Sequence, residues 1–573
     1  MPQNPAQLKE GELLLRVAEL ESEIKKLKER KKYGLVWEDR SEDVVLQCRE
    51  NVPILQEYKA QKIVTDEATS ANILIEGDNY HALSVLNYTH REAFDVIYAD
   101  PPYNTGNKSW RYNNDYVEKD DDFKHSKWLS YIHKRLLLAK NLLTDSGILI
   151  FAIDDYEAHT LRLLLDEVMG EDNRLGTIAV VHNPRGRNDD QFFATQHEYM
   201  LVYAKDHSRA EIGNFELTEE DRNQYKKHDE ISPYAETSFM RTGNNSNHHE
   251  RPKLFYPIFF NPRTRKLSLK LEKGGIEILP INEAGEEKTW RWGKETFERL
   301  CDTDLFVKTV KGRDRIFKKR RLTVDTGKKP KSVWYNSRYD ASTQGIMVLQ
   351  DIFGRGNHFN YPKSLLLMED ILEITSKPDS LVLDFFAGSG TTGHAVLKLN
   401  KKDGGNRRFV LSTNNENKIC EEVTYERLKR VIKGYTNSKD KNTVGLGGNL
   451  TYYKTALVSI DQLQKVSDEA KIKIAYQAGE MIAVRESTPD ELEKNDWWQL
   501  FGGSGKIMAV YFKEDKARLS DLVKKLEKTG RPVVLYVFGW GKNEYKNEYG
   551  SGKIRVEDIP EPILEVYKEL NRL

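Results

Sequence analysis

The stretch LVLDFFAGSGTTGHAVLKL, residues 381–399, joins an apolar run to a second apolar-rich run through a turn that contains glycine. The first run, which ends at Asp384, is typical of a buried strand, and the residues from Thr391 onward are typical of a helix. Gly388 and Gly390 have no Cβ, so the backbone can turn sharply there and come close to a ligand. The amides that open the helix would point at an anionic group. The stretch therefore predicts a strand, a ligand-binding turn and a helix.

The same alternation of strand and helix continues on both sides of this stretch. Strands are predicted at ANILIEGD (71–78), FDVIYAD (94–100) and GILIFAI (147–153), and helices at NYHALSVLN (79–87) and HSKWLSYIHKRLLLAKNLL (125–143). Such alternation is typical of a mostly parallel sheet with helices on both faces. Between about 206 and 345 the alternation stops, and the chain becomes polar and rich in Asn, Trp, Arg and Lys. We therefore expect an α/β domain interrupted by a different kind of segment.

The glycine turn resembles the S-adenosylmethionine loop of class I methyltransferases. The pattern F-x-G-x-G, with Phe386, Gly388 and Gly390, follows a strand that ends in an aspartate. Its spacing is neither the dinucleotide G-x-G-x-x-G nor the P-loop G-x-x-x-x-G-K. The resemblance implies that Asp384, this loop and Thr391 hold S-adenosylmethionine, whereas a plain turn or helix cap is the other interpretation.

A second stretch, VIYADPPYNTG at residues 96–106, places an aspartate, two prolines and a tyrosine at the end of a predicted strand. An exocyclic amine of a base is a poor nucleophile because its lone pair is delocalised into the ring. Acceptors that take a hydrogen bond from the amine stabilise the positive charge that develops on the nitrogen. The Asp100 carboxylate and the Pro101 carbonyl, held rigid by Pro102, provide two acceptors. Tyr103 offers a flat face on which a base can stack. We therefore assign Asp100 to Tyr103 as the catalytic tetrapeptide for a direct attack of the amine on a sulfonium methyl.

DPPY and DFFAGSG together resemble the amino-methyltransferases of DNA, and DPPY rather than SPPY favours adenine N6 over cytosine N4. The tetrapeptide precedes the glycine loop, an order that resembles the β group, whose class I (Rossmann-like) methyltransferase sheet is circularly permuted. KKYGLVWEDR, DPPYNTGNKSW, HNPRGRNDDQFFATQHEYMLVYAK and FNYPKSLLLMEDIL resemble the Mod subunit of Type III restriction-modification systems, over about residues 30 to 435. The resemblance implies N6-adenine methylation of specific sites in double-stranded DNA, a Mod homodimer, and a separate Res helicase-nuclease subunit.

The family pattern assigns four further residues to the cofactor. Asp78, at the end of LIEGD, is expected near the cofactor adenine, and Lys363 and Ser364 of YPKS near the methionine carboxylate. The acid that would bind the ribose is less clearly marked, because VLSTNNEN offers Asn414, Asn415 or Glu416, and we choose Glu416. Ordinary loop chemistry is the other interpretation for each.

These features predict five parts of the chain. They are an N-terminal helical or coiled-coil segment (1–50), the catalytic half of the methyltransferase domain (51–205), a target-recognition insert (206–345), the cofactor half (346–436) and a C-terminal α+β domain (437–573). The first contains a heptad seam from Leu13 to Leu27, which indicates either a dimer contact or a helix packed on its own protein.

The insert carries a dense basic run that suits phosphate contacts. The residues assigned to DNA binding are Lys308, Lys311, Arg313, Arg315, Lys318, Lys319, Arg320 and Arg321. A solvated surface is the other interpretation of such a run. The target adenine would have to be flipped out of the duplex, and side chains of RTGNNSNHHERPK (241–253) would read the neighbouring bases.

Charge, hydropathy and cysteine content exclude several kinds of protein and site. Lys plus Arg and Asp plus Glu both total 89, so net charge indicates no partner, and no apolar run reaches the roughly 20 residues that span a membrane. The three cysteines form no C-x-x-C pair, so neither a disulfide framework nor a cysteine metal site is expected, and we expect a cytoplasmic location. None of them follows a proline, so a nucleophile for methylation at cytosine C5 is not expected either. A solitary adenine-N6 or cytosine-N4 methyltransferase, and a subunit that only targets DNA, remain as alternatives.

Overall fold

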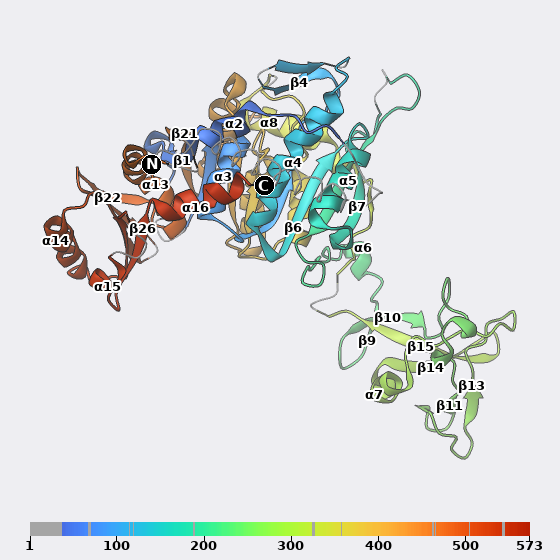
Figure 1. Ribbon diagram of the computed structural model, residues 1–573. Coiled ribbons are helices and arrows are strands. Elements are labelled where there is room, and N and C mark those ends of the chain that lie inside the picture. Colours follow the sequence, from blue (N-terminus) through green and yellow to red (C-terminus); the bar gives the residue numbers. More distant parts are fainter. Residues whose placement is uncertain are drawn as a thin grey trace, which may run out of the picture. The chain divides into compact units, whose positions relative to one another are not determined.

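The computed structural model describes residues 37–572 apart from 67–69, 114, 119, 187–189, 324–326, 357, 461–462, 464–465, 504 and 541–544. The predicted heptad seam from Leu13 to Leu27 lies outside these residues. The chain divides into two compact units, Met1–Gly213 with Lys331–Leu573, and Asn214–Pro330 (Figure 1). Among the described helices, none is long and apolar enough to cross a membrane.

A ten-stranded mixed sheet forms the centre of the first unit. Its strands lie in the order β1 (Asn51–Glu57), β21 (Asn449–Ser459), β2 (Ala71–Glu76), β18 (Arg408–Thr413), β17 (Leu381–Asp384), β3 (Phe94–Ala99), β6 (Leu143–Ile153), β8 (His197–Ala204), β7 (Arg174–Val181) and β16 (Val333–Trp334). The six strands from β21 to β6 are mutually parallel. β1 and β8 run antiparallel to their inner neighbours. The prediction of a largely parallel α/β sheet is therefore confirmed.

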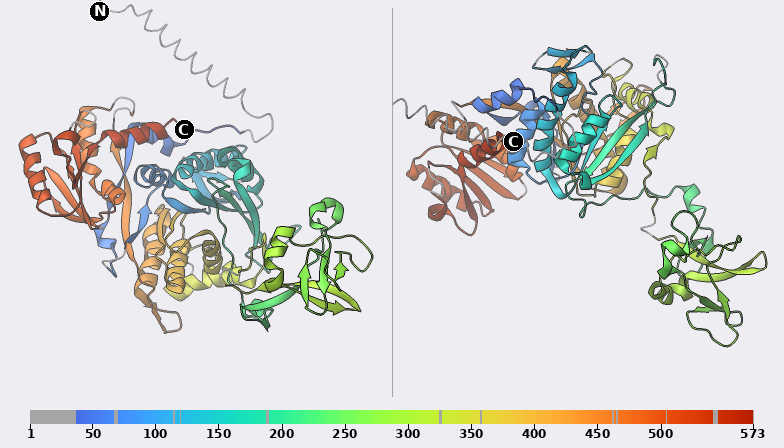
Figure 2. Two further views of the ribbon diagram at one scale, coloured as in Figure 1. Left: turned by 90° about the horizontal axis from the view of Figure 1, so that it is seen from below. Right: turned by 45° about the vertical axis from the view of Figure 1, so that its right-hand side comes forward.

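The central strands are short apolar runs because helices cover both faces of the sheet. α3 (Asn79–Thr89), α4 (Lys124–Leu142) and α5 (Ala158–Met169) pack on one face, and α9 (Leu365–Thr375), α10 (Thr391–Asp403) and α11 (Glu426–Lys433) on the other (Figure 2). In β3, every residue except Asp95 is buried. The strand that precedes the catalytic tetrapeptide is thus fixed on both sides.

The C-terminal part differs from the boundary expected at residue 437. β21 follows that boundary, yet it pairs with β2 and β1 in the central sheet. Further along the chain is a five-stranded sheet of β22 (Asp490–Lys494), β23 (Trp498–Gly503), β24 (Lys506–Tyr511), β25 (Val533–Phe538) and β26 (Ile554–Ile559), with α12 (Asp468–Gln477), α13 (Gly479–Glu486), α14 (Lys516–Glu527) and α16 (Glu561–Leu570) nearby in sequence. Met508 and Val510 of this sheet share one core with Leu83 and Leu86 of α3. Shared burial joins this region to the central sheet.

The second unit is smaller than the insert expected at 206–345. Residues 206–213 and 331–345 belong to the first unit, because β16 joins the central sheet beside β7. The unit contains a four-stranded sheet of β14 (Leu305–Val310), β15 (Arg313–Arg321), β10 (Pro233–Ser238) and β9 (Lys227–His228), a three-stranded sheet of β12 (Lys266–Ser268), β11 (Ile258–Asn261) and β13 (Ile276–Ile278), and α7 (Lys294–Asp304). Phe239, Trp290 and Phe297 are at the centre of its own core.

Candidate active site

The two stretches that carry the chemical signals come together at one edge of the central sheet. β17 and β3 are parallel neighbours, with Asp384 opposite Tyr98, so the glycine loop and the tetrapeptide begin at the same carboxyl edge. The chain leaves β17 for β18 on one side, and leaves β3 for β6 on the other. Such a switch point opens a crevice beyond the strand ends, which is where ligands bind in α/β sheets.

The tetrapeptide and the residue after it are held in place by an internal hydrogen bond and by side chains of α4 and of the residue before α5. The Tyr103 hydroxyl lies 2.8 Å from Asp100 Oδ1, and the buried Trp128 of α4 donates from Nε1 to the Pro102 carbonyl at 2.7 Å. Asn104 follows with φ of +57° and donates to the buried Glu157 at 2.6 Å. Asparagine tolerates this left-handed conformation better than most residues. The chain therefore turns sharply after Tyr103 while the tetrapeptide stays rigid.

A buried cluster of charges surrounds Asp100. Lys363 Nζ lies 3.2 Å from Asp100 Oδ1 and 2.6 Å from Glu198 Oε2, and it also donates to the Tyr103 hydroxyl. That hydroxyl is 3.0 Å from Glu198 Oε2 as well. A phenol has one proton, so Tyr103 donates to only one of the two carboxylates at a time. His182 Nδ1 lies 4.0 Å from Glu198. Two carboxylates thus share one ammonium group and one hydroxyl.

This arrangement shifts the protonation of each group. Burial raises the pKa of Asp100 above its usual value, and the Glu198 carboxylate adds to the rise, while Lys363 opposes it. Burial would also raise the pKa of Glu198, but Lys363 and His182 outweigh burial and hold it below its usual value. Burial would lower the pKa of Lys363, yet the two carboxylates raise it. Asp100 is therefore the carboxyl group of the pair that takes up a proton more readily.

The glycine loop has the geometry that its sequence predicts. Gly388 and Gly390 have φ of +48° and +74°, and a Cβ on Gly390 would lie 3.1 Å from Thr424 Cγ2. The Asp384 carboxylate accepts from the Phe386 N–H at 3.0 Å and from the Thr392 hydroxyl. Burial raises the pKa of Asp384 to about 7, against the effect of these two donors. The aspartate therefore supports the turn through hydrogen bonds that its own sequence neighbourhood supplies.

Two side chains support the loop from the side of α11 and the segment before it. The Thr424 hydroxyl donates to the Gly388 carbonyl at 2.6 Å. The fully buried Arg427 donates to the Ser389 carbonyl at 3.1 Å and to the Thr391 hydroxyl at 2.9 Å. Burial lowers the pKa of Arg427 to about 9. Nothing in the sequence around Arg427 predicted this role, because arginine in an amphipathic helix is usually a surface residue.

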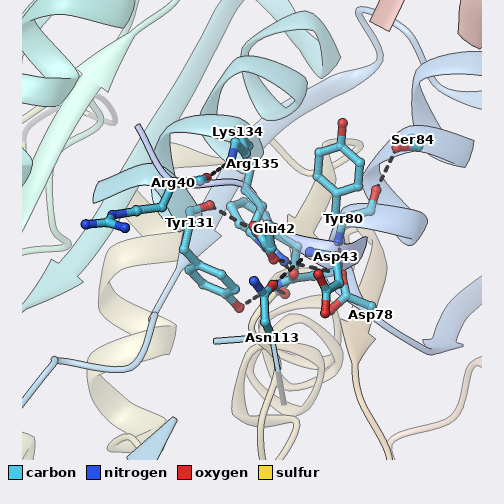
Figure 3. A network of polar contacts seen from close by, with 12 residues as sticks. Arg40, Glu42, Asp43, Asp78, Tyr80, Ser84, Asn113, Tyr131, Lys134 and Arg135 are labelled. Carbon is cyan, nitrogen blue, oxygen red and sulfur yellow. Dashed lines mark hydrogen bonds and ion pairs between the residues drawn. The ribbon is translucent and has the colours of Figure 1, made fainter. Parts of the chain in front are cut away.

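Asp78 lies at the carboxyl end of β2, where it caps α3 (Figure 3). Its carboxylate accepts from the Tyr80 N–H at 2.7 Å and lies 3.3 Å from Arg135 Nη2. The buried Arg135 also donates twice to the Glu42 carboxylate, at 3.0 and 2.8 Å, and to the Tyr131 carbonyl. Glu42 directly precedes α2 (Asp43–Glu50). Arg135 therefore links Asp78 to Glu42, in the first described segment of the chain.

The other residues assigned to the cofactor lie at the same edge with different contacts. Lys363 Nζ faces the charged cluster of the tetrapeptide rather than the glycine loop. Ser364 caps α9 by accepting from the Leu367 N–H at 3.2 Å. Glu416 starts a short 3-10 turn three residues after β18. The edge thus gathers Asp78, Glu416, the glycine loop and the tetrapeptide from four parallel strands, a donor and acceptor set that suits S-adenosylmethionine.

Glu198 was missed by sequence reasoning. It lies in β8, which runs antiparallel to β6, and is separated by 95 residues from Tyr103. The available signal was a carboxylate near the start of the otherwise apolar run HEYMLVYA, residues 197–204. A charged residue that is buried in a strand needs a partner, but the sequence does not say which.

The fold neutralises much of the basic run in the second unit. Lys308 pairs with Glu236, Lys311 and Arg315 pair with Glu283, and Lys319 and Arg321 pair with Asp229, with Arg321 also bound to Asp304. Lys318 instead lies over the Trp292 ring at 4.6 Å, and Arg320 lies 5.1 Å from the Tyr225 ring. Arg313 is exposed at the start of β15, opposite Val310. The acids that neutralise the run come from β10, the segment just after β9, the loop before α7 and the end of α7, outside the run itself.

Comparison with known proteins agrees with this geometry. Residues 94–426 match the family of N6/N4 DNA methylases, and the chain belongs to that family. It is therefore an S-adenosylmethionine-dependent DNA methyltransferase. The EcoPI Mod subunit of a Type III restriction-modification enzyme, from Escherichia phage P1, is 33% identical over 463 residues, or 73% of this chain and 71% of the relative.

Two further relatives differ in the type of system. The Type II methyltransferase M.KpnI from Klebsiella pneumoniae is 35% identical over 375 residues, covering 65% of this chain and 87% of the relative. The StyLTI Mod subunit of a Type III enzyme from Salmonella typhimurium is 28% identical over 399 residues, covering 65% of this chain and 57% of the relative.

Proposed function

We propose that the chain methylates N6 of an adenine that is flipped out of double-stranded DNA, as the Mod subunit of a Type III restriction-modification system. The observation that carries this proposal is the pairing of β17 with β3, which puts the glycine loop beside the tetrapeptide. The similarity to the EcoPI and StyLTI Mod subunits supports the Type III assignment. That assignment includes a Mod homodimer and a separate Res subunit, and a cytoplasmic location.

In this proposal each residue of the tetrapeptide has a distinct task. Asp100 and the Pro101 carbonyl accept hydrogen bonds from the two amino protons and so orient the nitrogen lone pair toward the glycine loop. Pro102, held by Trp128, keeps the two acceptors fixed, and the Tyr103 ring stacks on the base. Bound S-adenosylmethionine supplies an electrophilic methyl group. As the amine becomes positively charged, the adjacent carboxylate stabilises it and takes up one of its protons, which suits the raised pKa of Asp100.

The order of the parts supports a circularly permuted methyltransferase. β2, β3 and the tetrapeptide precede β17 and the glycine loop in the chain, with the second unit between them. We assign that unit, Asn214–Pro330, to target recognition. Lys318, Arg320 and Arg313 are the residues most available for phosphate, because the other cations of the basic run already have acidic partners.

A solitary methyltransferase is the second candidate, and the similarity to M.KpnI favours it. That Type II methyltransferase is matched over 87% of its length. The two candidates share the chemistry and differ only in the partner, so co-purification with a helicase-nuclease subunit from the native host separates them.

The chemistry is tested with Asp100→Asn, which keeps the size of the side chain and removes its charge. We expect methyl transfer into duplex DNA to fall by about 10²–10³-fold while DNA affinity stays the same. Mass analysis of nucleosides from DNA treated with the unaltered protein should show N6-methyladenine. Formation of N4-methylcytosine alone would reject the adenine assignment, and full activity of Asp100→Asn would reject the role of the carboxylate.

A further inference from the structure

Most large hydrophobic side chains with very high exposure lie next to the active site. Within the described part of the chain, four of them are more than four-fifths exposed: Phe192 at 82%, Phe193 at 89%, Tyr361 at 87% and Val444 at 84%. Phe193 precedes Glu198 by five residues, and Tyr361 precedes Lys363 by two. The three aromatic rings therefore lie on the two segments that lead into the charged cluster around Asp100.

The connection that carries the two phenylalanines has a well-ordered base. The N–H groups of His182 and Asn183 both donate to the Gln196 carbonyl, at 3.1 and 3.0 Å. The Asp190 carboxylate accepts from the Thr195 N–H at 2.7 Å. These bonds close the connection between β7 and β8 at its base, and Phe192 and Phe193 are exposed. The phenylalanine pair is thus presented outward from a fixed stem.

The connection also emerges on the side where catalysis takes place. β8 runs antiparallel to β6, so its first residues lie at the edge where β3 and β6 end. In Figure 1 the β7–β8 connection and the hairpin of β4 (Asn107–Tyr112) and β5 (Asp115–Glu118), which follows the tetrapeptide, extend from the same side of the sheet. The exposed phenylalanine pair therefore belongs to a connection that starts at the same sheet edge as the tetrapeptide.

We propose that Phe192 and Phe193 enter the base stack of the duplex at the position that the flipped adenine leaves. The inference rests on the proposed function and specifies how the substrate is held open. Extruding a base breaks its pairing and stacking, and apolar side chains such as phenylalanine fill opened base steps in other DNA complexes. An aromatic ring stacks on any base, so this contact would stabilise the open duplex without reading its sequence. Arg185, exposed in the same connection, has the charge to contact the adjoining phosphate.

The test compares the full-length chain with a Phe192→Ala/Phe193→Ala double variant on two duplexes. In one, the target adenine is paired with thymine, and in the other it faces an abasic position, so that it is already unpaired. Loss of stacking predicts a fall in single-turnover methylation of about 5- to 150-fold on the paired duplex. On the abasic duplex the fall should be much smaller. With 2-aminopurine at the target, the fluorescence increase on binding should also shrink at equal occupancy.

The control is Val444→Ser, which removes an equally exposed apolar side chain. Val444 lies five residues before β21, which starts at the opposite edge of the sheet because it runs parallel to β2, and this variant should match the unaltered protein on both duplexes. An equal fall of the double variant on both duplexes, or no fall on the paired one, overturns the proposal. If the product were N4-methylcytosine, the proposed adenine specificity would fail, while the same comparison around a target cytosine would still decide the role of the phenylalanines.

Discussion

Replacing Lys363 by methionine should move the pH dependence of methyl transfer. Lys363 Nζ is 3.2 Å from Asp100 and 2.6 Å from Glu198, and its charge lowers the pKa of the Asp100 carboxyl against the effect of burial. An opposite charge at this distance lowers a carboxyl pKa by about 1–3 units. Without it, the pKa of Asp100, which is already raised, should increase by a similar amount.

The sign of the effect follows from the role of Asp100. Only its ionised form accepts hydrogen bonds with both oxygens, so methyl transfer should fall as the pH drops through the pKa of Asp100. In Lys363→Met the midpoint of this acid limb should therefore move to higher pH by about 1–3 units. Each unit corresponds to about 1.4 kcal/mol. The other titratable groups that face Asp100 are Glu198, Tyr98, Tyr103 and Asp384, with His182 beyond Glu198. None of the groups that face Asp100 is a cation that could replace the ammonium of Lys363.

The assay is single-turnover methylation at saturating DNA and cofactor, across the pH range in which both proteins stay folded. Lys363→Arg retains the positive charge and should leave the limb near its original position. An unmoved acid limb in Lys363→Met, or a limb displaced to lower pH, would refute the electrostatic reasoning. A weaker affinity for S-adenosylmethionine with an unmoved limb would place Lys363 at the cofactor instead.

Three other changes test separate parts of the structure. Gly390→Ala puts a Cβ 3.1 Å from Thr424 at a φ of +74°, and calorimetry should show S-adenosylmethionine binding weakened by about tenfold or more. Arg135→Met leaves the buried Glu42 without its ion-pair partner. The free energy of unfolding should fall by about 3–5 kcal/mol, which a thermal melt would show as a lower unfolding midpoint. Arg320→Ala should reduce the slope of log affinity for DNA against log salt by about 0.9 in a fluorescence anisotropy titration.

Each of these changes has a matched control. Gly404→Ala has nearly the same φ, +72°, but no atom within 4 Å of the added Cβ, and equal loss of cofactor binding would contradict the argument for Gly390. Adding Glu42→Gln to Arg135→Met should recover much of the stability, since it removes the buried unpaired charge. Lys311→Ala deletes a cation that already pairs with Glu283, so the salt slope should change less than in the Arg320 variant. An equal change would contradict the argument that acidic partners keep the paired cations from binding phosphate.

The sequence was sufficient to predict which parts of the site lie at strand ends. FDVIYAD and LVLDFFAGSG each read as a buried strand that ends in a carboxylate, and the carboxyl ends of parallel strands meet at one edge. Glu198 could not be predicted, because its partners Tyr103 and Lys363 reach it from the turn after β3 and from the segment before α9. The acidic partners of the basic run could not be predicted for the same reason, since Asp229, Glu236 and Glu283 meet it only after folding.

The order of the strands also determines when the site can form during synthesis. β2 and β3 are made early, yet in the sheet they are separated by β17 and β18, which follow β3 by about 280 residues. At a translation rate of about 5–20 residues per second, the growing chain carries two unpaired, apolar strand edges for roughly 15 to 55 seconds. Chaperone capture, measured on stalled ribosomes, should therefore fall once residue 413 has left the exit tunnel, and fall again once β21, which covers the other edge of β2, has emerged.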